Sequence, residues 1–93
     1  SRILYFRADN RKIEIHTIGG NVITFYGKIS EVKRQTDVGR FIQISRSELV
    51  NYNAVEEYRG NMLTLRGGEV LPIVASRRKE AGEKILDYMG EMM

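Results

Sequence analysis

The first half of the chain contains the sequence Lys12-Ile13-Glu14-Ile15-His16-Thr17-Ile18-Gly19-Gly20-Asn21-Val22-Ile23-Thr24-Phe25-Tyr26. Residues 12–17 alternate between apolar and polar side chains, which is the pattern of a strand with one buried face. Residues 21–26 are rich in β-branched and aromatic side chains, which favour a second strand. Gly19 and Gly20 between them supply the positive φ angles of a tight turn. This part of the chain therefore predicts a β-hairpin.

The second half contains short apolar runs separated by glycine-containing turns. We expect three strands there, at residues 53–58, 62–66 and 69–74, with turns at Gly60-Asn61 and Gly67-Gly68. Pro72, the only proline of the chain, cannot donate a backbone hydrogen bond. The strand that contains it should therefore lie at the edge of a sheet.

The remaining segments predict two more strands and two helices. We expect strands at residues 3–6 and 41–46, helices at residues 28–35 and 77–92, and a turn or short edge piece at residues 47–51. Connections of hairpin length cannot join parallel strands, so the sheets should be antiparallel. The sequence thus predicts a mostly β fold of about seven short strands, with one short helix and a C-terminal helix.

Length and composition indicate one globular domain that spans residues 1–93. Hydrophobic residues make up 42% of the chain and charged residues 29%, which are ordinary values for a folded domain. Cysteine is absent, which removes disulfides and thiolate chemistry. No apolar run approaches the roughly 18 residues of a membrane span, so we expect a cytoplasmic protein without a membrane partner. The chain starts at Ser1 rather than Met, as an excised domain would.

The net charge of +3 is distributed unevenly along the chain. Residues 1–46 contain nine Lys or Arg against four Asp or Glu, a balance of +5. Residues 47–93 contain six against eight, a balance of −2. A basic half of this kind suits a polyanionic partner.

Cations lie at the start of the predicted C-terminal helix, although the amino end of a helix carries a partial positive charge that repels them. Residues 77–79 are Arg-Arg-Lys, and Ser76 before them is a favourable N-cap residue. Cations at this end make sense if an external anion, such as a phosphate, completes the site. The alternative is a solvated basic turn whose charge Glu80 and Glu83 neutralise.

Two other basic clusters lie where predicted elements end. They comprise Arg7, Arg11 and Lys12 at the first polar corner, and Arg46 between the hydroxyl residues Ser45 and Ser47. Arginine reads base edges as a bidentate donor, while hydroxyl and amide groups hold phosphates. Plain solvation explains each arginine taken alone, but three clusters in one short chain favour anion binding.

Few residues suit catalysis. His16, the only histidine, lies within a predicted strand and is explained better as a half-exposed strand residue than as a base. Glu56 and Glu57 are neighbours on a predicted strand, so they point to opposite faces. The sequence suggests no metal-binding cluster, and its glycine pairs are turns rather than phosphate-binding or dinucleotide-binding loops. We expect neither an enzyme nor a cofactor or metal.

The order of these elements resembles the LytTR family of bacterial DNA-binding domains. The resemblance rests on Phe41-Ile42-Gln43-Ile44-Ser45-Arg46-Ser47-Glu48-Leu49-Val50-Asn51, Ala54-Val55, Tyr58, the hairpin at residues 67–73, Ser76-Arg77-Arg78, and residues 3–6 and 13–17. It covers essentially the whole chain. Two places depart from the family pattern. Glu48 stands where the family usually has an aromatic or aliphatic residue, and Val74-Ala75 is inserted before the Ser-Arg pair.

This resemblance implies an elongated domain of three small antiparallel β-sheets, a three-sheet sandwich, with helices. Loops rather than a recognition helix would enter successive major grooves on one face of double-stranded DNA. Family members usually form the C-terminal output half of response regulators in two-component systems, behind a phosphorylated receiver domain. They regulate transcription by binding paired direct repeats, and can form a dimer on the DNA. The chain would then be the C-terminal part of a longer regulator.

The resemblance also implies which residues contact DNA. Its base-reading candidates are Asn10 or Arg11, Arg46, and Arg77, and its backbone-contacting candidates are Lys12, Ser45, Ser47, Ser76 and Arg78. Two choices stay open at this point. Either Asn10 or Arg11 is the first contacting residue, because a loop has no periodicity to fix its register. Either Arg77 or Arg78 is the last, because of the inserted pair Val74-Ala75. Asn51 is expected to be structural, with its amide capping a turn.

Two other classes of function compete with DNA binding. A small β interaction module would bind a protein or an anionic ligand through the same basic corners or through exposed strand edges. RNA binding is the weaker alternative, because single-strand readers expose aromatic side chains for stacking and most of the Phe and Tyr residues here fit core positions. Tyr52 and Tyr58 are the exceptions to consider.

Overall fold

The computed structural model describes residues 2–36 and 39–91. Its first half contains β1 (Ile3–Asp9), β2 (Lys12–Thr17), β3 (Val22–Tyr26), α1 (Ile29–Gln35), β4 (Phe41–Gln43) and β5 (Glu48–Asn51). Its second half contains the 3₁₀ turn η1 (Tyr52–Ala54), β6 (Val55–Arg59), β7 (Met62–Leu65), β8 (Val70–Pro72), the 3₁₀ turn η2 (Ala75–Arg77) and α2 (Arg78–Glu91). The predicted end of the last helix, residue 92, lies outside the described residues.

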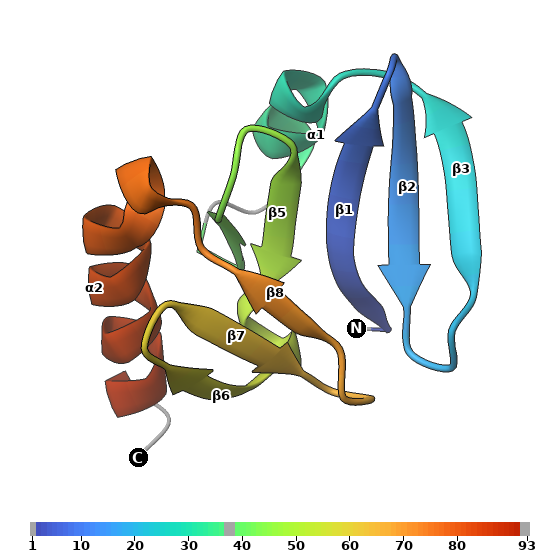
Figure 1. The fold of residues 1–93 in the computed structure, drawn as a ribbon. Helices are drawn as coiled ribbons and strands as arrows, with labels where there is room; N and C mark the ends of the chain where they lie inside the picture. Colours follow the sequence, from blue (N-terminus) through green and yellow to red (C-terminus); the bar gives the residue numbers. More distant parts are fainter. Residues whose placement is uncertain (1, 37–38, 92–93) are drawn as a thin grey trace.

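Five strands form one antiparallel sheet in the order β3-β2-β1-β5-β4, seen in Figure 1. The predicted hairpin is confirmed as β2 and β3, in a register that sets Ile13 opposite Phe25. Gly19 and Gly20 at its turn have φ angles of 95° and 84°. Glycine adopts such angles without the steric penalty of a Cβ, so the turn is encoded locally.

β1 extends beyond residues 3–6, the apolar run that predicted it, and ends only at Asp9. Arg7 lies opposite Glu14 of β2 and opposite Glu48 of β5. Opposite charges on neighbouring strands favour pairing. The polar half of this segment is therefore held in the sheet, and the predicted corner shrinks to a two-residue turn.

Residues 47–51 were predicted as a turn or edge piece, and this is wrong: they include an interior strand. β5 lies between β1 and β4, and its Leu49 and Val50 are both buried although they point to opposite faces. A strand that is buried on both faces shows no alternation between apolar and polar residues, so its sequence does not reveal it. β4 is correspondingly short and ends at Gln43 rather than at residue 46.

The second sheet consists of β6, β7 and β8, in that order and antiparallel. Pro72 lies in β8 at the edge of this sheet, as its missing backbone donor predicted. β6 begins at Val55 rather than at residue 53, because η1 precedes it.

Asn51 explains why a turn interrupts the chain before β6. Its side-chain Oδ1 accepts a hydrogen bond from the backbone N of Asn53 at 3.0 Å, which caps η1. Its Nδ2 donates to the backbone O of Ile3 at 2.8 Å. The structural role predicted for Asn51 is therefore confirmed.

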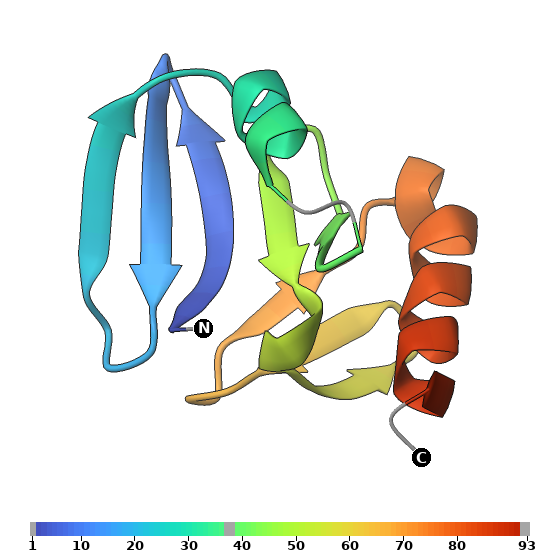
Figure 2. The same ribbon diagram turned by 180° about the vertical axis from the view of Figure 1, so that it is seen from behind.

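The two faces of the five-stranded sheet bury two different cores. The larger core lies between this sheet, the second sheet and α2, and includes Tyr5, Ile44, Leu63, Ile73 and Ile85. The smaller core lies between the opposite face and α1, which Figure 2 shows from behind, and includes Phe6, Ile13, Val32 and Leu49. Burial of these apolar surfaces is what holds the layers together.

Two sheets are present in the described part of the chain, whereas the resemblance implied three. β4 and β5 form no sheet of their own because β5 also pairs with β1, with Tyr5 opposite Val50. The three-sheet sandwich is therefore not confirmed, while the mostly β, antiparallel fold with a C-terminal helix is. The domain measures 36 × 28 × 21 Å. Within the described ranges, neither helix has the length and apolar character that crossing a membrane requires.

Candidate nucleic-acid interface

The three basic clusters of the sequence lie along one edge of the domain. This edge, at the top of Figure 1, carries the β1–β2 turn, the connection between β4 and β5, and the start of α2. Backbone hydrogen bonds join the three segments: the N of Ala8 donates to the O of Ser47 at 2.8 Å, and the N of Val74 donates to the O of Ile44 at 3.0 Å. The positions of the three clusters are therefore fixed relative to one another.

The first cluster is the β1–β2 turn. Asn10 and Arg11 form a two-residue turn, with φ angles of 49° and 70°. Glycine or asparagine usually occupies such positions, so Arg11 is held there at some conformational cost. Both side chains are exposed, and so is that of Lys12, the first residue of β2. Asn10 and Arg11 thus both project from the tip of the hairpin.

The second cluster lies between β4 and β5, in residues 44–47, which we call the Arg46 loop. Arg46 itself is exposed, while Ser45 beside it is buried, with 8% of its surface accessible. The Ser45 hydroxyl donates to Oε1 of Glu48 at 3.1 Å and accepts from the backbone N of Ser47 at 3.2 Å. Arg46 therefore stands at the tip of a loop that is hydrogen-bonded from within.

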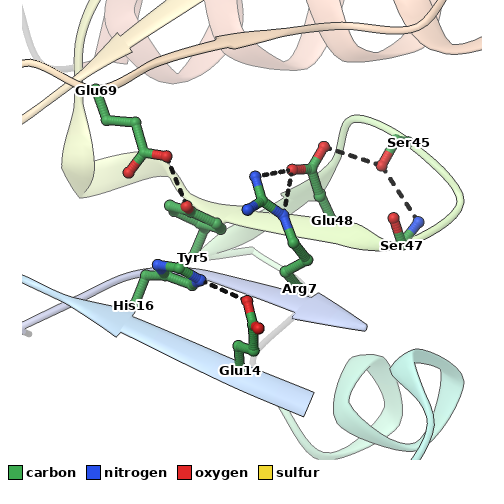
Figure 3. A network of polar contacts seen from close by, with 8 residues as sticks. All are labelled: Tyr5, Arg7, Glu14, His16, Ser45, Ser47, Glu48 and Glu69. Atoms are coloured by element: carbon green, nitrogen blue, oxygen red, sulfur yellow. Dashed lines mark hydrogen bonds and ion pairs between the residues drawn. The ribbon is translucent and has the colours of Figure 1, made fainter. Parts of the chain in front are cut away.

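Glu48 also joins this loop to the centre of the sheet, as Figure 3 shows. Its Oε2 accepts from Nε of Arg7 at 2.9 Å and from Nη2 of Arg7 at 2.6 Å. Burial opposes the charged form of Arg7, but the hydrogen bond to Glu48 and neighbouring charges raise the pKa of Arg7 above its ordinary value. Arg7 is thus committed to an internal ion pair, although the sequence grouped it with the basic residues of the corner.

The third cluster lies at the start of α2, where one prediction is wrong. Ser76 is not the N-cap of the long helix, because it sits in the middle of η2, whose own N-cap is Val74. The inserted pair Val74-Ala75 supplies the extra residues for this turn. Ser76 is exposed, Arg77 is half-buried, and Arg78 is exposed with its Nε donating to the backbone O of Ile73 at 3.0 Å.

The alternative, in which Glu80 and Glu83 neutralise this third cluster, finds only partial support, because the charge of Arg77 contributes to lowering the pKa of Glu80 but forms no salt bridge with it. Glu80 pairs with Lys84, at 2.9 Å, and this hydrogen bond is the main cause that lowers the pKa of Glu80. In residues 2–36 and 39–91, no ion pair involves residues 77–79, Arg11 or Arg46. These cations keep their charge available for an external anion.

His16 has structural partners, as its position in a strand predicted. Its ring stacks on that of Tyr5, with centroids 4.3 Å apart, and its Nε2 lies 2.9 Å from Oε1 of Glu14. The Tyr5 hydroxyl donates to Glu69 at 2.7 Å, and burial together with this bond raises its pKa. Among the described residues, no group of three or more His, Cys, Asp or Glu is placed to hold a metal ion.

The aromatic residues considered for stacking on RNA bases are not available for it. Tyr52 is buried and stacks on Tyr88, with centroids 4.8 Å apart, and Tyr58 packs against the larger core. The exposed aromatic residues lie instead on β3, where Tyr26 is 81% exposed and Phe25 is 41% exposed. The sequence did not indicate these two, because an edge strand with apolar residues on both faces resembles a buried strand.

Comparisons with known proteins bear on the family and on the fold. The sequence profile of the LytTr DNA-binding domain matches residues 1–85. A solved structure from Bacillus cereus, the LytTr DNA-binding domain of a protein described as a methyl-accepting/DNA response regulator, superposes with a TM-score of 0.79 at 21% sequence identity. The match covers 91% of this chain and 81% of that chain. A search of curated proteins finds no match.

The profile match includes the residues that carried the resemblance, and the likeness of fold adds a comparison of structure. The profile extends over nearly the whole chain, from β1 into α2. The solved structure shows that the arrangement of strands and helices recurs in a domain of similar length. The chain belongs to the LytTR family of DNA-binding domains.

Proposed function

We propose that this domain binds double-stranded DNA with sequence preference, as the transcriptional output domain of a two-component response regulator. The observation that carries the proposal is that three basic segments share one edge and that their exposed cations form no salt bridge among the described residues. Membership of a DNA-binding family identifies the polyanion as DNA. Lysine and arginine on such an edge neutralise phosphates and release counterions, which favours binding.

The shape of the domain suits loops rather than a recognition helix as the reading elements. The β1–β2 turn and the start of α2 lie at opposite ends of the shared edge, with the Arg46 loop between them, and loops on this edge would enter successive major grooves on one face of the duplex. The longest dimension of the domain, 36 Å, is close to the pitch of B-DNA, which is about 34 Å. One domain is therefore long enough to reach grooves one turn apart.

Within this proposal the residues divide into two roles. Asn10 or Arg11, Arg46 and Arg77 would read base edges, because an arginine offers two donors to guanine and an asparagine offers one donor and one acceptor to adenine. Contacts to the phosphate backbone would come from Lys12, Ser47, Ser76 and Arg78. Ser45 was expected to join them, but its hydroxyl is buried and engaged within the loop, which favours an indirect role for it.

Membership of the family also suggests the domain organisation and the DNA target of the full-length protein. We expect a cytoplasmic regulator in which a receiver domain precedes this output domain. Paired direct repeats would be its target, with two copies bound side by side on the DNA. An enzymatic role is not part of the proposal.

The test is a selection from a pool of random duplexes, followed by binding of the winner and of a scrambled control at two salt concentrations. We expect two direct-repeat half-sites about one helical turn apart, bound far more tightly than the control. Each neutralised phosphate should contribute about 0.9 to the slope of log affinity against log salt. Equal, weak binding to both duplexes that salt abolishes would contradict the proposal.

A second candidate function, protein binding through a sheet edge, is favoured by one observation. β3 is the outer strand of the five-stranded sheet, and its exposed side chains include Val22, Ile23, Phe25 and Tyr26. An uncharged edge strand with unpaired backbone groups can pair with a strand of another chain. A protein partner that survives nuclease treatment in a pull-down, and that Ile23→Lys abolishes, would support this function.

A further inference from the structure

We infer that Glu48 is a positioning residue that holds the Arg46 loop in its DNA-reading conformation, in partnership with Arg7 and Ser45. The inference rests on the proposed function, since it assigns the source of precision at one of the proposed contacts.

The contacts of Glu48 point to this role because both oxygens of its carboxylate are used. Oε2 accepts two hydrogen bonds from Arg7, and Oε1 accepts one from Ser45 (Figure 3). The side chain of Glu48 is only 13% exposed, so water competes weakly for these bonds. Hydrogen bonds to an ionised group are roughly twice as strong as those between neutral groups.

On one side, Glu48 contacts the Arg46 loop directly through Ser45. The Ser45 hydroxyl that it orients also accepts the backbone N–H of Ser47, at 3.2 Å. These two links flank Arg46 in the sequence, one residue before it and one residue after it. The base of the loop is closed by the N of Ile44, which donates to the O of Glu48 at 3.1 Å.

On the other side, Arg7 ties Glu48 to rigid parts of the fold. Arg7 lies in β1 in the interior of the sheet, with its guanidinium 5.2 Å from the centre of the Tyr5 ring. Tyr5 is fully buried, and its hydroxyl bonds to Glu69, which lies between β7 and β8. The Arg46 loop is therefore connected through Glu48, Arg7 and Tyr5 to both sheets.

A purely electrostatic role for Glu48 and a positioning role predict opposite changes in DNA affinity when Glu48 is substituted, which makes the inference testable. Glu48 is a negative charge close to the edge that would face phosphates, so its removal should strengthen binding if charge alone mattered. A positioning role predicts that removing this charge weakens specific binding, because Arg46 loses its alignment with the base edge.

The first variant is Glu48→Gln, which keeps the size of the side chain. An amide offers one acceptor oxygen instead of two, so it cannot accept from Arg7 and from Ser45 with separate oxygens. We expect affinity for the selected duplex to fall about tenfold, within the range that one bidentate base contact is worth. Affinity for a scrambled duplex should stay equal or rise slightly. The matched control is Glu57→Gln, which removes the same charge from an exposed pair with Arg59 in β6.

A double-mutant cycle shows whether Glu48 acts through Arg46. In an Arg46→Ala background, Glu48→Gln should cause no further loss of specific affinity, since the contact that it positions is gone. Additive losses from the two changes would overturn the inference. So would a Glu48→Gln variant with the wild-type preference for the selected duplex.

Amide hydrogen exchange provides a readout that does not require DNA. The N–H of Ser47 should exchange faster in Glu48→Gln and in Ser45→Ala than in the wild type, while amides of β7 keep their protection. Unchanged protection of Ser47 in both variants would overturn the inference even if neither they nor the wild type bound DNA. Failure of the wild type to prefer any duplex would instead count against the proposed function, and the two failures are therefore distinguishable.

Discussion

At the scale of single residues, the proposed contacts divide into those that read bases and those that hold the backbone. Arg46 is exposed at the tip of a loop whose neighbouring side chains are internally bonded. Lys12 is exposed beside the β1–β2 turn, with its amine 5.9 Å from the centre of the Tyr26 ring. A planar guanidinium can recognise one base pair, whereas an ammonium group acts as a point charge.

Arg46→Ala should weaken binding to the selected duplex by about 1–3 kcal/mol and relax the preference at one position. Lys12→Ala should weaken binding to all duplexes alike and lower the salt slope by about 0.9. Titrations of both variants with the selected duplex and with single-base variants of it provide the measurement. Unchanged affinity and preference in Arg46→Ala would show that this arginine is not a base reader.

Arg11 connects stability with function at the same scale. Its φ of 70° is unfavourable for a residue with a Cβ, so Arg11→Gly should raise the free energy of unfolding by up to about 1 kcal/mol. If Arg11 is the base reader of this turn, the same variant should lose affinity for the selected duplex. Asn10→Gly is the matched variant, and the one of the two that loses preference identifies the contacting residue. Urea unfolding and DNA titration of both variants decide the matter.

At the scale of elements, a glycine lies where α2 approaches β6 closely. Gly82 faces Tyr58 of β6, and a Cβ at this position would lie 2.7 Å from the tyrosine hydroxyl oxygen. Gly90, in the last turn of the same helix, has open space around it. Two glycines of one helix therefore have different reasons to be there.

Gly82→Ala should lower the free energy of unfolding by about 1 kcal/mol, because displacement of Tyr58 costs more than the gain in helix propensity. Gly90→Ala should raise it by up to about 1 kcal/mol, because it gains propensity without a clash. Thermal unfolding followed by circular dichroism compares the two. A stabilised Gly82→Ala would mean that Tyr58 moves aside at little cost.

At the scale of the whole molecule, buried phenols make the fold sensitive to alkali. Burial, with contributions from Glu80 and Asp87, raises the pKa of Tyr52 to about 12, above its ordinary value of 10.0. The unfolded chain therefore gives up this proton at lower pH than the folded chain does. The stabilising contribution of the buried, neutral Tyr52 phenol is fully present below pH 10 and is lost as the pH rises toward 12.

This shift predicts a loss of roughly 2–3 kcal/mol from Tyr52 across that interval. Tyr5 is expected to add to the loss, since burial and its bond to Glu69 raise its pKa as well. Urea unfolding at several pH values tests this, and Tyr52→Phe should flatten the alkaline slope. Tyr26→Phe, at an exposed position, is the control and should leave the slope unchanged.

How far the sequence predicted the fold depended on whether the information was local. The β2–β3 hairpin, the edge position of Pro72 and the cap formed by Asn51 were all correct, because each depends on a local property: the φ angles open to glycine, the missing donor of proline and the short side chain of asparagine. The failures were β5, which no periodicity marks, and the start of α2, where η2 intervenes.

The candidate site shows the same division between local and tertiary information. The sequence by itself determined the basic segments, because charge and exposed position at the ends of elements can be read without a structure. Only the tertiary structure decided that these segments share one edge, and that Arg7 and Ser45 point inward to Glu48. The reason is that residues 7 and 48 meet through the pairing of β1 with β5, which strand sequences alone do not specify.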